Sequence, residues 1–113
     1  MKNLEYKKYT GSIEYSPEDG VFYGKVLGIK SLISYEGETG RELEADFKEA
    51  IDMYLADCKA EGKTPEKPFK GSFNVRIAAS LHKRAALLAA ASNTSLNSLV
   101  EESIRLRIAQ DGI

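Results

Sequence analysis

One short segment constrains the fold of this chain more than any other: Gly71–Ile77, GSFNVRI, alternates apolar and polar side chains, and no second strand-like run follows it. Alternation with period two places Phe73, Val75 and Ile77 on one face of a strand and the polar residues on the other. A single strand leaves both of its edges without backbone hydrogen bonds. The pattern therefore predicts that this strand pairs with a strand of another molecule.

Two helical patterns follow this strand. Ser80 is expected to cap the first helix, and Ser95 is expected to cap the second. A unit of one strand and two helices is too small to bury a sufficient core alone. We therefore predict a homodimer in which two copies of the strand form an antiparallel ribbon that lies on four helices. The predicted dimer core consists of Phe73, Val75, Ile77, Leu99, Val100 and Ile104.

The polar face of the predicted ribbon carries Ser72, Asn74 and Arg76, which all donate hydrogen bonds. A two-stranded ribbon fits the DNA major groove, where arginine pairs with guanine and asparagine with adenine. These three side chains are therefore candidates for reading bases.

The N-terminal part predicts a strand meander followed by one long helix. Strands are expected at 9–15, 21–26 and 31–35, with a turn at Ser16–Gly20 where proline and Asp-Gly favour a hairpin. Thr39 and Glu42 have the spacing of a capping box at the start of the helix. Its apolar stripe consists of Leu43, Phe47, Ala50, Ile51, Tyr54, Leu55 and Cys58.

A segment with two prolines separates these two parts. The predicted organisation is an N-terminal domain at 1–60, a linker at 61–70 and a C-terminal domain at 71–113. Residues 1–70 hold 11 Lys/Arg and 14 Asp/Glu, a net charge of −3, whereas residues 71–113 hold 5 and 3, a net charge of +2. The basic part is thus the one that carries the candidate DNA-reading face.

Composition limits the other functions. No apolar run approaches the roughly 20 residues of a membrane helix, and residues 1–9 lack the apolar core of a signal peptide, so we expect a cytoplasmic protein without membrane contact. Cys58 is the only cysteine and is expected in the core, whereas His82 is expected at the surface. We expect no metal site and no cofactor.

The C-terminal residues resemble the ribbon-helix-helix family of bacterial repressors, the Arc/MetJ class. The resemblance rests on Ser72–Ile77, on Leu81-His82, and on Thr94–Val100 with Glu102. It implies that the outward strand residues read bases and that the start of the second helix holds a DNA phosphate. The implied phosphate-binding residues are Ser95, Leu96 and Asn97. Ala78-Ala79 depart from the pattern, because many members have proline just after the strand.

The N-terminal residues resemble the HicB antitoxin family. The resemblance rests on Tyr15–Gly24, on Gly28, on Tyr35–Thr39 and on the helical pattern at 44–51. It implies an α+β protein in which a partial ribonuclease-H-like domain precedes the ribbon-helix-helix domain. Such a protein neutralises a HicA-like mRNA-cleaving toxin and represses its own operon by binding operator DNA as a homodimer or a dimer of dimers.

Two other functions are compatible with parts of this sequence. A ribonuclease-H-like nuclease needs carboxylates that converge on a metal, and the strands offer only Glu5 and Glu14, so we expect no enzyme. A ribbon-helix-helix repressor with an N-terminal ligand-sensing domain and no toxin partner is the alternative. A neighbouring reading frame for a short basic protein would favour the antitoxin.

Overall fold

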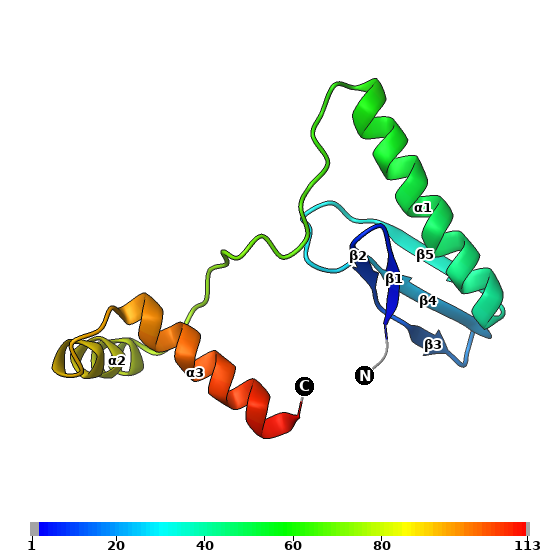
Figure 1. Ribbon diagram of the computed structural model, residues 1–113. Coiled ribbons are helices and arrows are strands. Elements are labelled where there is room, and N and C mark those ends of the chain that lie inside the picture. The colour runs from blue at the N-terminus through cyan, green and yellow to red at the C-terminus, as the bar shows by residue number, and fades with distance from the viewer. Residues whose placement is uncertain (1–2, 113) are drawn as a thin grey trace. The chain divides into compact units, whose positions relative to one another are not determined.

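The computed structural model describes residues 3–112, which form two small antiparallel sheets and three helices (Figure 1). The predicted α+β class is confirmed at this level. The chain divides into two compact units, Met1–Ser72 and Phe73–Ile113, which we call the N-terminal unit and the C-terminal unit.

The N-terminal unit contains five short strands and one helix. Strands β1 (Leu4–Tyr6) and β2 (Tyr9–Gly11) form a hairpin. Strands β3 (Glu14–Ser16), β4 (Val21–Lys25) and β5 (Ser34–Gly37) form an antiparallel sheet in the order β3-β4-β5. An isolated β-bridge between Gly11 and Val26 joins the two sheets, and helix α1 packs against both of them.

The strand boundaries differ from the prediction in two places. The strand expected at 9–15 is divided into β2 and β3, and β1 was not anticipated. The turn before β2 is formed by Lys7 and Lys8 with positive φ of 49° and 72°, so no glycine or asparagine marks it in the sequence. The third strand begins at Ser34 instead of Ser31, because the preceding loop donates hydrogen bonds elsewhere in the unit.

The turn between β3 and β4 is formed as predicted. The Gly20 N–H donates to the Ser16 carbonyl oxygen at 2.8 Å, and Gly20 has a φ of 64°. This positive φ favours glycine, which has no Cβ to clash with the backbone. The turn brings Ser16 opposite Val21 and sets the register of the hairpin.

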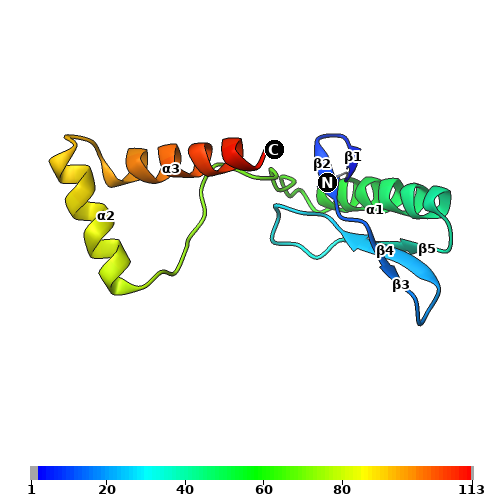
Figure 2. The same ribbon diagram turned by 90° about the horizontal axis from the view of Figure 1, so that it is seen from below.

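Helix α1 (Gly40–Ala60) lies along one face of the strands (Figure 2). The capping box is confirmed: the Glu42 N–H donates to Thr39 Oγ1 at 3.1 Å, and the Thr39 N–H donates to Glu42 Oε2 at 3.1 Å. Both contacts satisfy amides that the first turn leaves free. The buried apolar side chains between helix and strands are Tyr9, Val26, Ile33, Tyr35, Leu43, Phe47 and Ile51. Cys58 is also buried, as predicted.

Glycines let the strands approach the aromatic core closely. A Cβ on Gly11 would lie 2.6 Å from Phe47 Cε1, and one on Gly24 would lie 2.8 Å from the Tyr35 hydroxyl. The Tyr35 hydroxyl instead donates to the Ser12 carbonyl oxygen at 2.8 Å, and its ring meets Phe47 edge-on at 5.0 Å between centroids. The packing of this core therefore requires glycine at positions 11 and 24.

The C-terminal unit consists of α2 (Ala79–Ala91) and α3 (Leu96–Asp111) after an irregular segment. Ser95 caps α3 as predicted, since the Ser98 N–H donates to Ser95 Oγ at 3.0 Å. The cap predicted for the first helix is wrong: Ala78 occupies the N-cap position without a side-chain hydrogen bond, and Ser80 lies inside α2. Residues 73–78 form neither helix nor strand in the single chain. A strand needs hydrogen bonds to a neighbouring strand, and the neighbour predicted for this segment belongs to a second molecule.

Candidate functional site

The residues predicted to read DNA bases lie on the irregular segment before α2. Ser72, Asn74 and Arg76 are all exposed, and within residues 3–112 none of these side chains takes part in a hydrogen bond. They remain free to meet another molecule. The structure therefore leaves the predicted reading face accessible, while its pairing into a ribbon stays a prediction.

The start of α3 presents the geometry of an anion site. Ser95 has an extended backbone, and its hydroxyl oxygen accepts the Ser98 N–H. The N–H groups of Leu96 and Asn97 in the first turn have no acceptor within the helix and are directed out of its N-terminal end. Free amides and the helix dipole favour a negative group there. Leu96 is half-buried and Asn97 is exposed. With Ser95, these are the three residues that the ribbon-helix-helix resemblance implies for a DNA phosphate.

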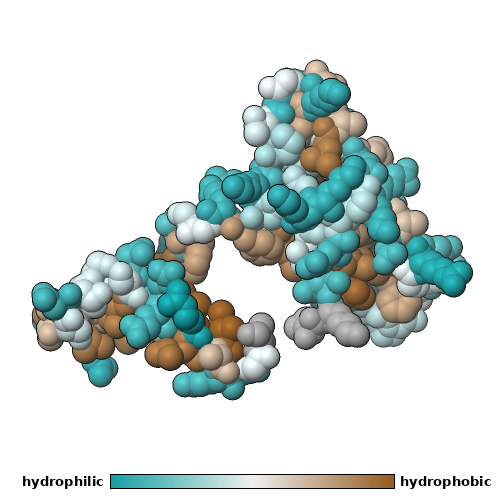
Figure 3. Space-filling view, in the orientation of Figure 1, coloured by the Kyte–Doolittle hydropathy of each residue, from teal (hydrophilic) through white to brown (hydrophobic). Residues whose placement is uncertain are grey.

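The residues predicted to form the dimer core are open to solvent in the single chain. Phe73 is 72% exposed, Val75 66% and Ile77 49%, and on α3 Val100 and Ile104 are exposed while Leu99 is half-buried. Among residues 73–112, Ala89 alone is buried. Apolar side chains gather visibly on this unit in Figure 3. The exposed large apolar residues of the unit are Phe73, Val75, Ile77, Leu81, Leu87, Leu88, Val100, Ile104, Leu106 and Ile108.

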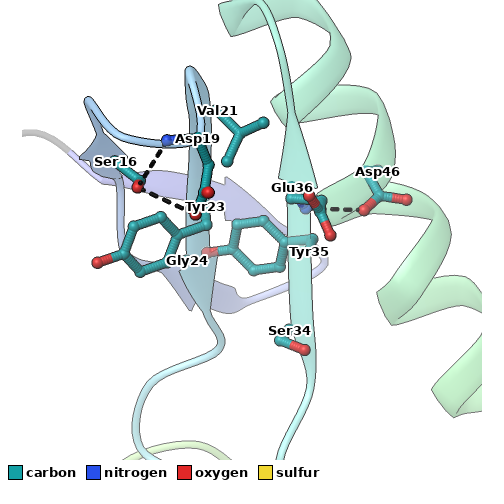
Figure 4. A pocket seen from close by; sticks show the side chains of 9 residues that line it. All are labelled: Ser16, Asp19, Val21, Tyr23, Gly24, Ser34, Tyr35, Glu36 and Asp46. Atoms are coloured by element: carbon teal, nitrogen blue, oxygen red, sulfur yellow. Dashed lines mark hydrogen bonds between the residues drawn. The ribbon is translucent and has the colours of Figure 1, made fainter.

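A second candidate site is a shallow hollow of about 520 Å³ on the N-terminal unit (Figure 4). Its acidic side chains come from three elements: Asp19 from the turn after β3, Glu36 from β5 and Asp46 from α1. The remaining lining residues are Ser16, Val21, Tyr23, Gly24, Ser34 and Tyr35. This constellation was missed at the sequence level, because the three acids are far apart in the chain and only the fold brings them to one hollow.

Internal hydrogen bonds hold two of these acids in place. Asp46 Oδ2 accepts the Glu36 backbone N–H at 2.9 Å, and Asp19 Oδ2 accepts the Ser16 hydroxyl at 3.3 Å. Within the described part of the chain, none of the three carboxylates forms an ion pair. The hollow thus offers uncompensated negative charge to a partner.

Elsewhere on the N-terminal unit, opposite charges meet at the surface. The Lys7 ammonium donates to Asp52 at 2.8 Å, and this hydrogen bond lowers the pKa of the Asp52 carboxyl. Tyr6 also donates to Asp52, at 3.0 Å. Since Lys7 and Asp52 remain about half exposed, the pair joins the β1–β2 hairpin to α1 without constituting a buried charge site.

Within residues 3–112, the other candidate side chains do not gather into a further site. His82 is exposed on α2. Over residues 3–112, no group of three His, Cys, Asp or Glu side chains has the arrangement of a metal site. None of the helices described has the length and apolar character to cross a membrane.

The model of the HicB family matches residues 54–104. The matched residues begin in the second half of α1, pass through the connection and α2, and end in α3. This match supports a HicB-type antitoxin, and with it a function related to a toxin–antitoxin system and a toxin of some kind as partner. No curated protein and no solved structure gives a significant match to the chain.

Proposed function

We propose that this protein is a non-enzymatic antitoxin that binds a HicA-like mRNA-cleaving toxin and represses its own operon through a C-terminal ribbon-helix-helix domain. The observation that carries the proposal is the HicB family match at residues 54–104, which spans most of the C-terminal unit. The N-terminal unit, a meander with one helix, would be the partial ribonuclease-H-like domain that binds the toxin.

The burial pattern of the C-terminal unit supports the homodimer. Ten large apolar side chains are exposed there, and a unit of this size with Ala89 as its one buried residue among 73–112 has too little core to fold alone. Pairing of residues 73–77 with the same residues of a second copy would supply the missing backbone hydrogen bonds. It would also cover Phe73, Val75 and Ile77. A pair of such dimers on adjacent half-sites would be the dimer of dimers.

The same pairing would present the reading face twice. In a twofold ribbon, Ser72, Asn74 and Arg76 of both copies would face the major groove. The free amides at the start of α3 would then meet the phosphate backbone. The net charge of +2 on residues 71–113 favours this approach to DNA.

The acidic hollow supports a basic protein as the partner of the N-terminal unit. Asp19, Glu36 and Asp46 form no ion pair within residues 3–112, and complementary charge accelerates and orients association. We propose that the toxin contacts this unit and that the hollow belongs to the contact. Charge reversal by Asp46→Lys in the full chain should then weaken toxin binding and leave operator binding unchanged.

The DNA-binding part of the proposal is tested with Arg76→Ala in a gel-shift titration at fixed salt. Each bidentate arginine–guanine pair contributes about 1–3 kcal/mol of discrimination, and the twofold ribbon loses it in both half-sites. Operator affinity should fall by roughly a hundredfold or more, while the dimer persists. Arg107→Ala, near the end of α3, removes the same charge away from the ribbon and serves as the control. Unchanged DNA binding by Arg76→Ala would refute the reading face.

The toxin-binding part is tested by co-expression with a neighbouring reading frame for a short basic protein. Stable co-purification and rescue of growth would support the antitoxin. The second candidate, a repressor with an N-terminal ligand sensor, draws on the volume of the hollow, which lies within the range of small-molecule pockets. Failure of co-purification together with release of DNA by a small molecule would favour the sensor.

A further inference from the structure

The segment between α1 and the C-terminal unit is held to the N-terminal unit at Glu66. The two carboxylate oxygens of Glu66 accept the backbone N–H groups of Lys30 and Ser31 at 2.7 and 3.0 Å. Hydrogen bonding by the Ser31 side chain, and then by these two backbone groups, lowers the pKa of the Glu66 carboxyl, so the acceptor is charged at neutral pH. One side chain thus links the segment to the loop between β4 and β5.

The backbone of Glu66 is bound as well. Its N–H donates to the Tyr54 hydroxyl oxygen on α1 at 2.8 Å, and its carbonyl oxygen accepts the Tyr9 hydroxyl of β2 at 3.0 Å. The two tyrosine rings meet edge-on at 6.2 Å between centroids. Glu66 therefore contacts a loop, a strand and a helix that are far apart in the sequence.

A second attachment lies three residues further along. The Phe69 N–H donates to the Gly28 carbonyl oxygen at 3.1 Å, and the Phe69 ring lies so close that a Cβ on Gly28 would be 2.7 Å from it. Phe69 has a φ of +50°, a conformation that a bulky residue adopts only where its surroundings enforce it. In the sequence, the two prolines of this segment predict a linker at 61–70.

We propose that Glu66 is a latch that holds residues 64–69 on the N-terminal unit and leaves only Lys70–Ser72 as a free connection to the C-terminal unit. Between Phe69 and Phe73 the free chain spans at most about 14 Å, whereas a chain released from Glu61 onward would span about 40 Å. A short tether holds whatever binds one unit beside whatever binds the other and raises their effective concentration. This last step rests on the proposed function, whereas the latch itself does not.

The latch is tested in the full chain, without DNA or toxin, by backbone ¹⁵N relaxation. In the unmodified protein, residues 64–69 should be as rigid as α1, and residues 70–72 should be more mobile. Glu66→Ala removes both carboxylate acceptors, and the rigidity of Phe69, three residues further along, should fall to that of residues 70–72. Glu66→Gln keeps a single carbonyl acceptor and should give an intermediate loss.

A proteolytic assay supplies an independent readout on the same variants. Tryptic cleavage after Lys63 should accelerate several-fold in Glu66→Ala, because a released segment enters the protease more readily. Glu18→Ala in the β3–β4 turn removes the same charge and should change neither readout.

Three outcomes would overturn the latch. The first is mobility of residues 64–69 equal to that of 70–72 in the unmodified protein. The second is that residues 64–69 remain as rigid as α1 in Glu66→Ala. The third is unfolding of α1 together with the segment in both Glu66 variants, which would make Glu66 a core stabiliser. Because these measurements contain neither DNA nor toxin, failure of the latch can be distinguished from failure of the proposed DNA binding or toxin binding.

Discussion

The two units of this chain differ in the burial of their apolar side chains. In the N-terminal unit, seven apolar side chains of α1, the strands and the adjoining loops form one buried cluster, with Phe47 and Ile51 fully inaccessible. In the C-terminal unit, Ala89 is the one buried residue among 73–112, and ten large apolar side chains are exposed. Both units have clear amphipathic patterns, so the pattern alone does not decide whether a core closes within one chain.

The free energy of unfolding of the two units therefore has different sources. A core within one chain gives an unfolding free energy that is independent of protein concentration, whereas a core shared between two chains gives one that rises with concentration.

Phe47→Ala should cause the largest loss in the N-terminal unit. Phe47 is fully buried and meets Tyr35, so its truncation should lower the unfolding free energy by about 3–5 kcal/mol. Urea titration followed by tyrosine fluorescence measures this loss, since all six tyrosines precede residue 72. Met53→Ala, on an exposed position of the same helix, should change stability by less than about 0.5 kcal/mol. A loss that varied with protein concentration would contradict a core within one chain.

Phe73→Ala should have a comparable effect that appears only through association. In the single chain Phe73 is exposed, so the substitution would hardly change the unfolding free energy of a monomeric unit. In the proposed dimer the side chain is buried, and truncation should destabilise the dimer by about 3–5 kcal/mol. Sedimentation equilibrium and melting at several concentrations of residues 71–113 measure this. Phe73→Leu should retain most of the stability. A monomeric transition at a constant temperature would contradict the dimer.

Alkaline titration should affect the N-terminal unit alone. Burial raises the pKa of Tyr35 to about 12, because the protein favours its neutral phenol. The resulting stabilisation is fully present below pH 10 and is lost as the pH rises from 10 towards 12. Ultraviolet titration should show one tyrosine ionising last, and Tyr35→Phe should remove that component. Six tyrosines titrating together in the folded protein would contradict the burial of Tyr35.

Removal of the helix caps should give the smallest effects, one in each unit. Thr39→Ala and Ser95→Ala each remove a hydroxyl that accepts an N–H of the first helical turn, which costs about 1 kcal/mol. The loss at Thr39 should be independent of concentration, and the loss at Ser95 should appear in the dimer transition. Thr94→Ala beside Ser95 serves as the control. Equal dependence on concentration at both caps would remove the contrast between the units.

Local features were predicted well where a specific side chain carries the signal. The capping box of Thr39 and Glu42, the Ser95 cap and the turn that ends at Gly20 all appear as expected, since each depends on residues within four positions of one another. The Lys7–Lys8 turn was missed because lysine gives no turn signal. The Ser80 cap was wrong because the N-cap position of α2 falls two residues earlier, at Ala78, which has no side-chain acceptor.

The amino-acid sequence alone determined the mixed class, the long helix with its buried stripe and the unpaired alternating segment at 71–77, because these follow from periodicity and local hydrogen bonding. The tertiary structure decided the rest. It brought Asp19, Glu36 and Asp46 to one hollow and attached Glu66 to the β4–β5 loop. Such contacts join residues ten or more positions apart, and their formation depends on the path of the folded chain, which no local pattern specifies.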